Sequence, residues 1–213
     1  MTNKSAKLRG LYGITDERLL PHTHALLSSA EAALRGGLSI LQYRAKSLTR
    51  AEQTRQAMAL RRLCAEHDAL FIINDDVELA NAVAADGVHI GRDDDAIERV
   101  RDRLGDAAII GVSCYNQLEL AHQAQQQGAD YVAFGRFFAS LTKPEAVQAE
   151  PGLLAQAKTE LDIPLCAIGG ITTDNAAELI ARGADMIAVI HDLFAQTDVE
   201  QQSQRFQRLF GSH

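Results

Sequence analysis

The sequence has little of what membrane-spanning, secreted or nucleic-acid-binding proteins need. No apolar run approaches the roughly 18 residues of a membrane-spanning helix. The N-terminus, MTNKSAKLRG, is polar and basic, so we expect no secretion signal. A formal net charge of −7 argues against a basic face for nucleic acid. We therefore expect no membrane and no nucleic acid among the partners, whereas a small anion needs only a few local cations.

Cysteine and proline are also scarce. Cys64, Cys114 and Cys166 are an odd, widely spaced set without CxxC spacing, which indicates reduced, mostly buried thiols in a cytoplasmic protein. The four prolines are scattered, and no Gly/Ser-rich or Pro-rich linker divides the chain. Residues 1–213 therefore predict a single domain, with residues 1–9 as a flexible N-terminal tail.

Short apolar runs alternate with segments of helical period along the chain. The predicted strands cover residues 11–15, 40–43, 70–73, 87–90, 108–112, 131–134, 165–168 and 186–189. The predicted helices cover residues 24–35, 50–67, 77–84, 96–104, 117–127, 152–160, 175–182 and 199–209. Nearly unbroken apolar strands are typical of a parallel sheet buried on both faces. Eight such units favour the α/β class and a single-domain (β/α)8 TIM barrel, because a flavodoxin-like sheet needs only about five.

In such a barrel the loops after the strands hold the chemistry. After the second strand, Gln42, Arg44 and Lys46 alternate, and a period of two places them on one face. The planar fork of arginine and the point charge of lysine together suit a phosphate or pyrophosphate. The alternative is a solvated loop with ordinary basic residues. The anion site is favoured because Arg44 lies where the strand meets its active-site loop.

Carboxylates follow two neighbouring strands. Asn74, Asp75 and Asp76 end the third strand, and residues 93–95, all aspartate, follow the fourth. One carboxylate from each group could share Mg²⁺, which keeps several waters and takes few protein ligands. The alternative role is helix N-capping, which we expect for Asp76 and for at least one of residues 93–95. No His/Cys spacing indicates zinc.

The loops after the last strands offer further anion-binding groups. Residues 140–143, Ser-Leu-Thr-Lys, supply two hydroxyls and an ammonium, although without P-loop glycine spacing. Gly169 and Gly170 bring backbone N–H groups close to a ligand, and a tight turn explains one glycine more naturally than two. His191 either contacts an anion there or starts a helix with its side chain in solvent. Cys114 is expected to pack, because no histidine is placed to activate it.

Together, these strand ends resemble the thiamine-phosphate synthase (thiamine-phosphate pyrophosphorylase) family. The matching segments are LYGITD at 11–16, LQYRAK at 41–46, IINDDVELA at 72–80, ADGVHIGRDD at 85–94, IIGVS at 109–113, GADYVAFGRFFASLTKP at 128–144, AIGGIT at 167–172 and GADMIAVI at 183–190. Eight motifs in order and at consistent spacing make the match specific, and it extends over residues 11–209.

The resemblance implies a Mg²⁺-dependent transferase with two small phosphorylated substrates. It would join 4-amino-2-methyl-5-(hydroxymethyl)pyrimidine diphosphate to 4-methyl-5-(2-phosphoethyl)thiazole and release pyrophosphate, through a pyrimidine-methyl cation. The residues implied for the pyrimidine diphosphate are Gln42, Tyr43, Arg44, Ala45, Lys46, Asn74, His89, Ser113 and Lys143, with Tyr12 helping His89 to position the ring. Those implied for the thiazole phosphate are Ser140, Leu141, Thr142, Gly170, Ile190 and His191. The implied Mg²⁺ ligands are Asp75 and Asp94, and the implied catalytic residues are Arg44, Lys46, Ser113 and Lys143. The resemblance leaves a homo-oligomer open.

Two departures and two rival families bear on this resemblance. Where family members commonly carry a serine after the eighth strand, this chain has His191, and Ser140 replaces a common threonine. A related thiazole tautomerase is expected to carry a histidine soon after the strand-five serine, whereas Ser113 is followed by Cys-Tyr-Asn. A non-catalytic phosphate-ligand sensor should have lost the metal carboxylates, and these remain. The residues favour the synthase.

Overall fold

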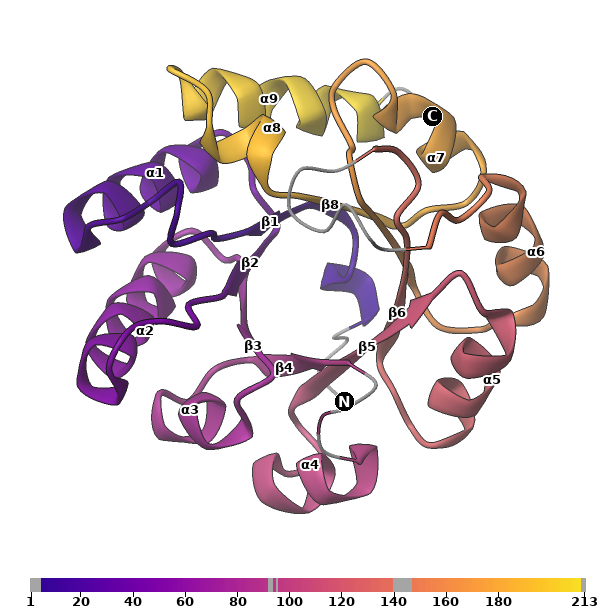
Figure 1. The fold of residues 1–213 in the computed structure, drawn as a ribbon, viewed down its shortest axis with the longest axis horizontal. Coiled ribbons are helices and arrows are strands. Elements are labelled where there is room, and N and C mark those ends of the chain that lie inside the picture. Colours follow the sequence, from indigo (N-terminus) through magenta and orange to yellow (C-terminus); the bar gives the residue numbers. More distant parts are fainter. Residues whose placement is uncertain (1–4, 92–93, 95, 140–146, 212–213) are drawn as a thin grey trace.

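The computed structural model of the protein describes residues 5–91, 94, 96–139 and 147–211 (Figure 1). Its strands pair in parallel, each with its neighbours in sequence, and close into a barrel in the order β1 to β8. The predicted (β/α)8 barrel is confirmed. The strands are β1 (Gly10–Ile14), β2 (Ile40–Tyr43), β3 (Leu70–Asn74), β4 (Gly87–Ile90), β5 (Ile109–Tyr115), β6 (Tyr131–Phe134), β7 (Leu165–Ile168) and β8 (Met186–Val189).

Helices surround this barrel (Figure 1). They are α1 (Thr23–Arg35), α2 (Arg50–Glu66), α3 (Val77–Ala82), α4 (Ile97–Leu104), α5 (Leu118–Gln126), α6 (Gly152–Glu160), α7 (Ala176–Ala181), α8 (His191–Phe194) and α9 (Val199–Phe210). The short helix α8 was not predicted, because its four residues are too few to show a helical period. Within the described residues, none of these helices combines the length and apolar character needed to cross a membrane.

The side chains of each strand alternate between two cores. The inner core fills the barrel and contains Leu8, Tyr12, Ile14, Ile40, Leu70, Ile72, Ile109, Tyr131, Ala133, Cys166, Met186 and Ala188. The outer core lies between the strands and the helices, and it holds the alternate residues, such as Leu11, Leu41 and Phe71. Continuing the inward set by two residues along each strand leads to the C-terminal rim. The polar residues at the strand ends are therefore directed into the mouth of the barrel.

The opposite end of the barrel is fixed by a repeated carboxylate contact. Asp86, Asp130 and Asp185 each precede an even-numbered strand. Each accepts a hydrogen bond from the backbone N–H of a residue near the start of the preceding odd-numbered strand, at 2.8, 2.8 and 2.9 Å. Each also pairs with a cation from the helix that precedes the odd-numbered strand, namely Arg61 of α2, Arg101 of α4 and Lys158 of α6. Asp86 and the aspartates of the two Gly-Ala-Asp segments, residues 128–130 and 183–185, therefore serve stability at the end of the barrel away from the cavity.

The segment before β1 also contributes to this end. Residues 5–9 include the 3-10 helix η1 (Ser5–Lys7), which lies within the ring of strands in Figure 1. Leu8 is only 1% exposed and packs in the inner core. Lys7 pairs with Asp68, between α2 and β3. Leu8 is thus a packed residue of the barrel, although the sequence suggested that it belongs to a tail.

Candidate functional site

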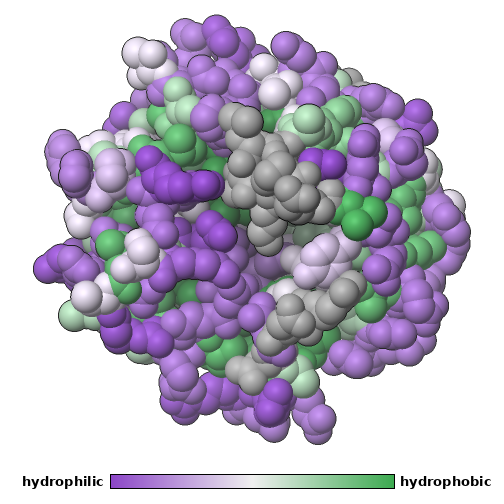
Figure 2. All heavy atoms as spheres, viewed as in Figure 1, coloured by the Kyte–Doolittle hydropathy of each residue, from purple (hydrophilic) through white to green (hydrophobic). Residues whose placement is uncertain are grey.

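A cavity of about 310 Å³ opens at the C-terminal ends of the strands. Each of the eight strands, or the loop that follows it, supplies at least one lining residue. On the same face in Figure 2, hydrophilic residues surround a hollow near the centre of the barrel. The described lining residues are Ile14, Gln42, Arg44, Asn74, His89, Ser113, Tyr115, Ala133, Gly135, Arg136, Ala139, Ile168, Gly169, Gly170, Ile171, Thr172, Ala188, Val189, Ile190, His191 and Asp192.

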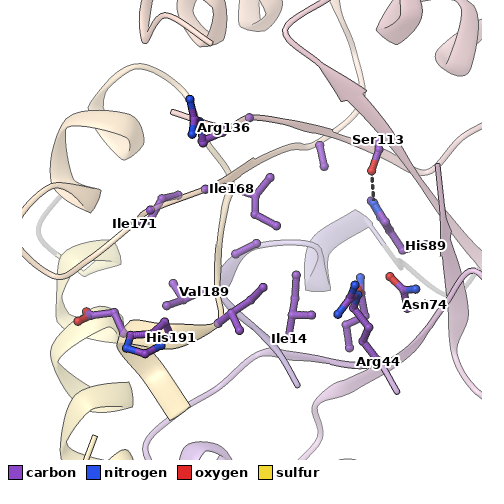
Figure 3. Close-up of a pocket in the computed structure, with 18 of the residues that line it drawn as sticks. Ile14, Arg44, Asn74, His89, Ser113, Arg136, Ile168, Ile171, Val189 and His191 are labelled. Carbon is purple, nitrogen blue, oxygen red and sulfur yellow. Dashed lines mark hydrogen bonds between the residues drawn. The ribbon is translucent and has the colours of Figure 1, made fainter. Parts of the chain in front are cut away.

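The cavity has two polar sides. Figure 3 shows Arg44, Asn74, His89 and Ser113 along one side, from β2 to β5, and it shows Arg136 and His191 on the other. Apolar side chains, including Ile14, Ile168 and Val189, lie between the two sides (Figure 3). Such an arrangement suits two polar ligands that meet over an apolar floor.

The alternation along β2 brings Gln42 and Arg44 to the first side. Gln42 is 3% exposed, and its Nε2 donates to the Tyr12 hydroxyl at 2.7 Å. The backbone N–H of Arg44 donates to Thr15 Oγ1 at 2.9 Å, which ties this position to the end of β1. Tyr43 points the other way, and its hydroxyl donates to Gln56 of α2 at 2.8 Å. The side chain of Tyr43 therefore packs between the barrel and α2.

The carboxylates predicted to bind metal lie beside this side of the cavity. Asp75 has a φ of 62°, a left-handed conformation that aspartate tolerates better than most residues. Its Oδ2 accepts a hydrogen bond from Asn74 Nδ2 at 2.6 Å and pairs with Lys46 Nζ at 3.2 Å. Burial and the neighbouring Asp94 raise the pKa of Asp75, and Lys46 partly opposes them. Two carboxylates brought together in this way leave an excess of negative charge that a cation would neutralise.

The neighbouring aspartates differ in role. Asp94 Oδ2 accepts a hydrogen bond from the backbone N–H of Gly91 at 2.6 Å. Asp76 caps α3 by accepting from Leu79 N–H at 2.8 Å, as predicted. Residues 93 and 95 lie outside the described residues, and the N-cap of α4 is Ala96. The described residues contain no group of three or more His, Cys, Asp or Glu side chains arranged for a metal. Asp75 and Asp94, the two predicted metal ligands, lie close enough for Asp94 to act on the carboxyl of Asp75.

Ser113 and His89 form a contact that the sequence did not predict. His89 Nε2 lies 2.9 Å from Ser113 Oγ, as the dashed line in Figure 3 shows. The strand β5 runs three residues beyond its predicted end, and its pairing with β6 shifts register between Ser113 and Tyr115. That irregularity leaves Ser113 and Tyr115 at the cavity and Cys114 in the outer core. Burial raises the pKa of Cys114 to about 12, which agrees with the predicted packing role.

The second side is built from the ends of β7 and β8. Gly169 and Gly170 have φ values of 105° and 66°. A Cβ on Gly169 would lie 2.6 Å from Arg136 Cα, and one on Gly170 would lie 2.2 Å from the Ala139 carbonyl oxygen. Backbone geometry therefore requires glycine at both positions, although a tight turn was expected to explain one glycine more naturally than two. Asp192 accepts from Thr173 N–H at 3.2 Å and from Gln202 at 2.8 Å, which joins this loop to α9.

The predicted site residues fall into four groups. Those that line the cavity are Gln42, Arg44, Asn74, His89, Ser113, Gly170, Ile190 and His191. Lys46, Asp75 and Asp94 adjoin it through the contacts described above. Tyr43 and Ala45 are not among the described residues that line it. Ser140, Leu141, Thr142 and Lys143 lie outside the described residues.

Among the residues of the site that were missed in the sequence, four have polar side chains that matter for its contacts. Arg136, Tyr115 and Asp192 line the cavity, and Tyr131 lies beneath it, where its hydroxyl contacts His89 Nδ1 at 2.9 Å. Arg136 immediately follows the Gly135 that ends the sixth barrel segment, so its place after a strand was a usable signal. The sequence around Tyr131 is that of an ordinary apolar strand. It does not show that the Tyr131 hydroxyl meets a side chain from another strand.

Comparisons with known proteins agree with one another. A family profile described as thiamine monophosphate synthase matches residues 11–193. The thiamine-phosphate synthase of Thioalkalivibrio sulfidiphilus is 49% identical over 210 residues, which cover 99% of each chain. That of Alcanivorax borkumensis is 53% identical over 194 residues, which cover 91% of this chain and 89% of the relative. Among solved structures, thiamine phosphate pyrophosphorylase from Pyrococcus furiosus matches with a TM-score of 0.89 and 37% identity, over 98% of both chains.

Proposed function

The chain belongs to the thiamine-phosphate synthase family of transferases and makes thiamine phosphate, and we propose that the two polar sides of its cavity bind the two substrates. The observation that carries this proposal is the separation of the polar groups by an apolar floor (Figure 3). The side with Arg44 and Asn74 suits the pyrimidine diphosphate. The side with Gly170 and His191 suits the thiazole phosphate, where many TIM barrels bind phosphate after β7 and β8.

The proposed reaction needs charge stabilisation more than proton transfer. The C–O bond between the pyrimidine methylene and the diphosphate breaks, and its electron pair leaves with pyrophosphate. The thiazole nitrogen then donates its lone pair to the methylene carbon to form the C–N bond. A cation held ~4 Å from the departing charge contributes roughly 4 kcal/mol at an effective dielectric constant near 20, before desolvation. We propose Arg44, Lys46 and Lys143 for this role.

The carboxylate pair fits Mg²⁺ by its donor chemistry. Asp75 and Asp94 supply hard oxygen ligands, and burial and repulsion from Asp94, which together raise the pKa of Asp75, favour a bound cation. When bound, Mg²⁺ would neutralise charge on the diphosphate. Lys46 is within 3.2 Å of Asp75, so the anion-binding loop and the proposed metal ligands adjoin.

We also propose a cytoplasmic location, since the three cysteines are buried free thiols.

Replacing a proposed metal ligand tests the Mg²⁺ assignment. Asp75→Asn removes one negative charge and should raise the Mg²⁺ concentration for half-maximal rate by roughly tenfold or more. Asp76→Asn is the matched control, because Asp76 caps α3 and asparagine retains that function. The Mg²⁺ titration of this control should stay near that of wild type. An unchanged titration for Asp75→Asn would contradict ligation by Asp75.

The activity itself is tested by supplying the purified chain with both substrates and Mg²⁺. We expect pyrophosphate and thiamine phosphate to form in equal amounts. Isomerisation of a thiazole phosphate without pyrophosphate release would instead indicate a tautomerase. Saturable binding of the phosphorylated ligands without any turnover would indicate a sensor. Either result would overturn the proposed use of the site.

A further inference from the structure

A chain of hydrogen bonds crosses the barrel interior directly beneath the cavity. Gln42 Nε2 donates to the Tyr12 hydroxyl at 2.7 Å, and that hydroxyl lies 2.8 Å from the hydroxyl of Tyr131. Tyr131 then contacts His89 Nδ1 at 2.9 Å, and His89 Nε2 contacts Ser113 Oγ at 2.9 Å. The two ends, Gln42 and Ser113, line the cavity. Tyr12 and Tyr131 are 1% and 0% exposed, so the centre of the chain is dry.

A glycine in the barrel leaves room for this chain of hydrogen bonds to form. His89, Gly111 and Tyr131 are in register on the adjacent strands β4, β5 and β6. A Cβ on Gly111 would lie 2.0 Å from Tyr131 Cζ, so the glycine lets the ring pass over β5. The Tyr131 and His89 rings are 5.6 Å apart with an interplanar angle of 28°. Gly111 thus allows a tyrosine of one strand to reach a histidine two strands away.

The proton count gives the chain a direction. Because Gln42 donates at one end, the Tyr12 hydroxyl uses its own proton toward Tyr131. Tyr131 in turn donates to His89 Nδ1, and the remaining imidazole proton is then on Nε2, directed at Ser113. In the reverse order, the proton of the Tyr12 hydroxyl would face the Gln42 amide N–H group without an acceptor, in a fully buried position. The forward order leaves each internal donor with an acceptor.

We propose that Tyr12 and Tyr131 are positioning residues that hold His89 as its Nε2–H tautomer, so that Ser113 offers its own hydroxyl proton to an acceptor atom of the bound substrate. This inference rests on the proposed function for the identity of that substrate, the pyrimidine diphosphate. Its ring nitrogens and its diphosphate oxygens are both acceptors. The contact favours a ligand that presents an acceptor to Ser113, since the hydroxyl proton of Ser113 then has an acceptor while its oxygen accepts from His89.

Burial of the two tyrosines supports a fixed direction. Desolvation raises the pKa of both Tyr12 and Tyr131 above the usual tyrosine range. Neither hydroxyl therefore loses its proton at neutral pH, and each keeps both a donor and an acceptor function. The donor-to-acceptor direction that begins at Gln42 is therefore kept along the hydrogen bonds as far as Ser113, on the far side of the barrel.

The tautomer can be measured in the unliganded protein without any assay of activity. Long-range ¹H–¹⁵N correlation spectra of the full chain labelled with ¹⁵N-histidine distinguish the two neutral tautomers, and loss of one signal in His89→Gln assigns His89. We expect the Nε2–H pattern in wild type and its loss or mixing in Tyr131→Phe. An Nδ1–H pattern in wild type would overturn the proposal while leaving the proposed function intact.

Steady-state kinetics test whether the chain of hydrogen bonds acts on the reaction through Ser113. Tyr131→Phe should lower kcat about fivefold or more, the effect of one lost hydrogen bond, and Tyr12→Phe should act in the same direction. Combining Tyr131→Phe with Ser113→Ala should add little to Ser113→Ala alone. Ser203→Ala is the control, because it removes a buried hydroxyl that is bonded to the Ala33 carbonyl at 2.8 Å and is not among the described residues that line the cavity. Its kcat should stay near that of wild type. Independent, additive effects of Tyr131→Phe and Ser113→Ala would overturn the proposal.

Discussion

At the scale of single residues, the absence of a side chain can matter as much as its presence. Gly111 lies between two ring-bearing residues on neighbouring strands, and the space of its missing Cβ is occupied by Tyr131. The same residue therefore serves both packing inside the barrel and the polar groups of the cavity. A methyl group there would displace a fully buried ring into a core that has little free volume.

Gly111→Ala should therefore destabilise the protein by about 1–3 kcal/mol, the range for overpacking a well-packed core. Urea unfolding followed by circular dichroism measures this change. Gly152→Ala is the matched control, since a Cβ there meets none of the described residues within 4 Å and Gly152 lies at the start of α6. The control should change stability by no more than about 0.5 kcal/mol. Equal effects of the two substitutions would show that Tyr131 moves aside at little cost.

Prediction at this scale worked where a simple period applies. The period of two along β2 predicted that Gln42 and Arg44 share a face, and both line the cavity. The same period directs Tyr43 outward, although the family resemblance placed it in the substrate set. Contacts between distant strands have no such periodic signal. The Tyr12–Tyr131 contact joins residues 119 positions apart, and neither strand sequence predicts it.

At the scale of elements, a loop from one strand holds the active-site loop of the next. Glu17 follows β1, and its Oε2 accepts hydrogen bonds from the backbone N–H groups of Lys46 and Ser47, both at 3.1 Å. Lys46 in turn pairs with Asp75 after β3. The loop after β2 is thus held from both sides, which fixes the backbone that carries the proposed diphosphate-binding cations.

Glu17→Ala removes both acceptor contacts to this loop. We expect the KM for the pyrimidine diphosphate to rise about fivefold, because roughly 1 kcal/mol of loop ordering must then be supplied on binding. The KM for the thiazole phosphate should hardly change, since its proposed side lies across the cavity. Glu31→Ala is the control, as Glu31 makes an exposed pair with Arg35 on α1. Steady-state kinetics with each substrate varied in turn would contradict this idea if both KM values rose alike.

The elements themselves were largely predictable, with informative exceptions. Strand boundaries agreed because nearly continuous apolar runs are bounded by glycine and aspartate. The end of β5 was misplaced because Ser113 and Tyr115 are polar, although their backbone continues to pair with β6 through a shift in register. A polar residue at a strand end is easily taken for loop when it faces a cavity. This error therefore fell next to the site.

At the scale of the whole molecule, the two ends of the barrel have different tasks. The C-terminal end carries the cavity, and the opposite end carries the Asp86, Asp130 and Asp185 contacts together with η1. A closed barrel lets these ends vary independently, because the inner core separates them. The overall fold was predictable from alternation alone. The packing of Leu8 was not, because a single leucine in a polar segment carries no period.

Leu8→Ala tests this separation of tasks. Leu8 is 1% exposed within the inner core, so its truncation should destabilise the protein by about 2–5 kcal/mol in urea unfolding. Both KM values should stay near those of wild type under conditions where the variant is folded, because Leu8 lies at the end of the barrel away from the cavity. Met58→Ala is the control, since Met58 is 55% exposed on α2 and its truncation should change stability by no more than about 0.5 kcal/mol. If Leu8→Ala matched this control, the first nine residues would behave as the tail that the sequence suggested. A large loss of stability with unchanged KM values would instead make the segment a structural part of the barrel, independent of the site it helps to support.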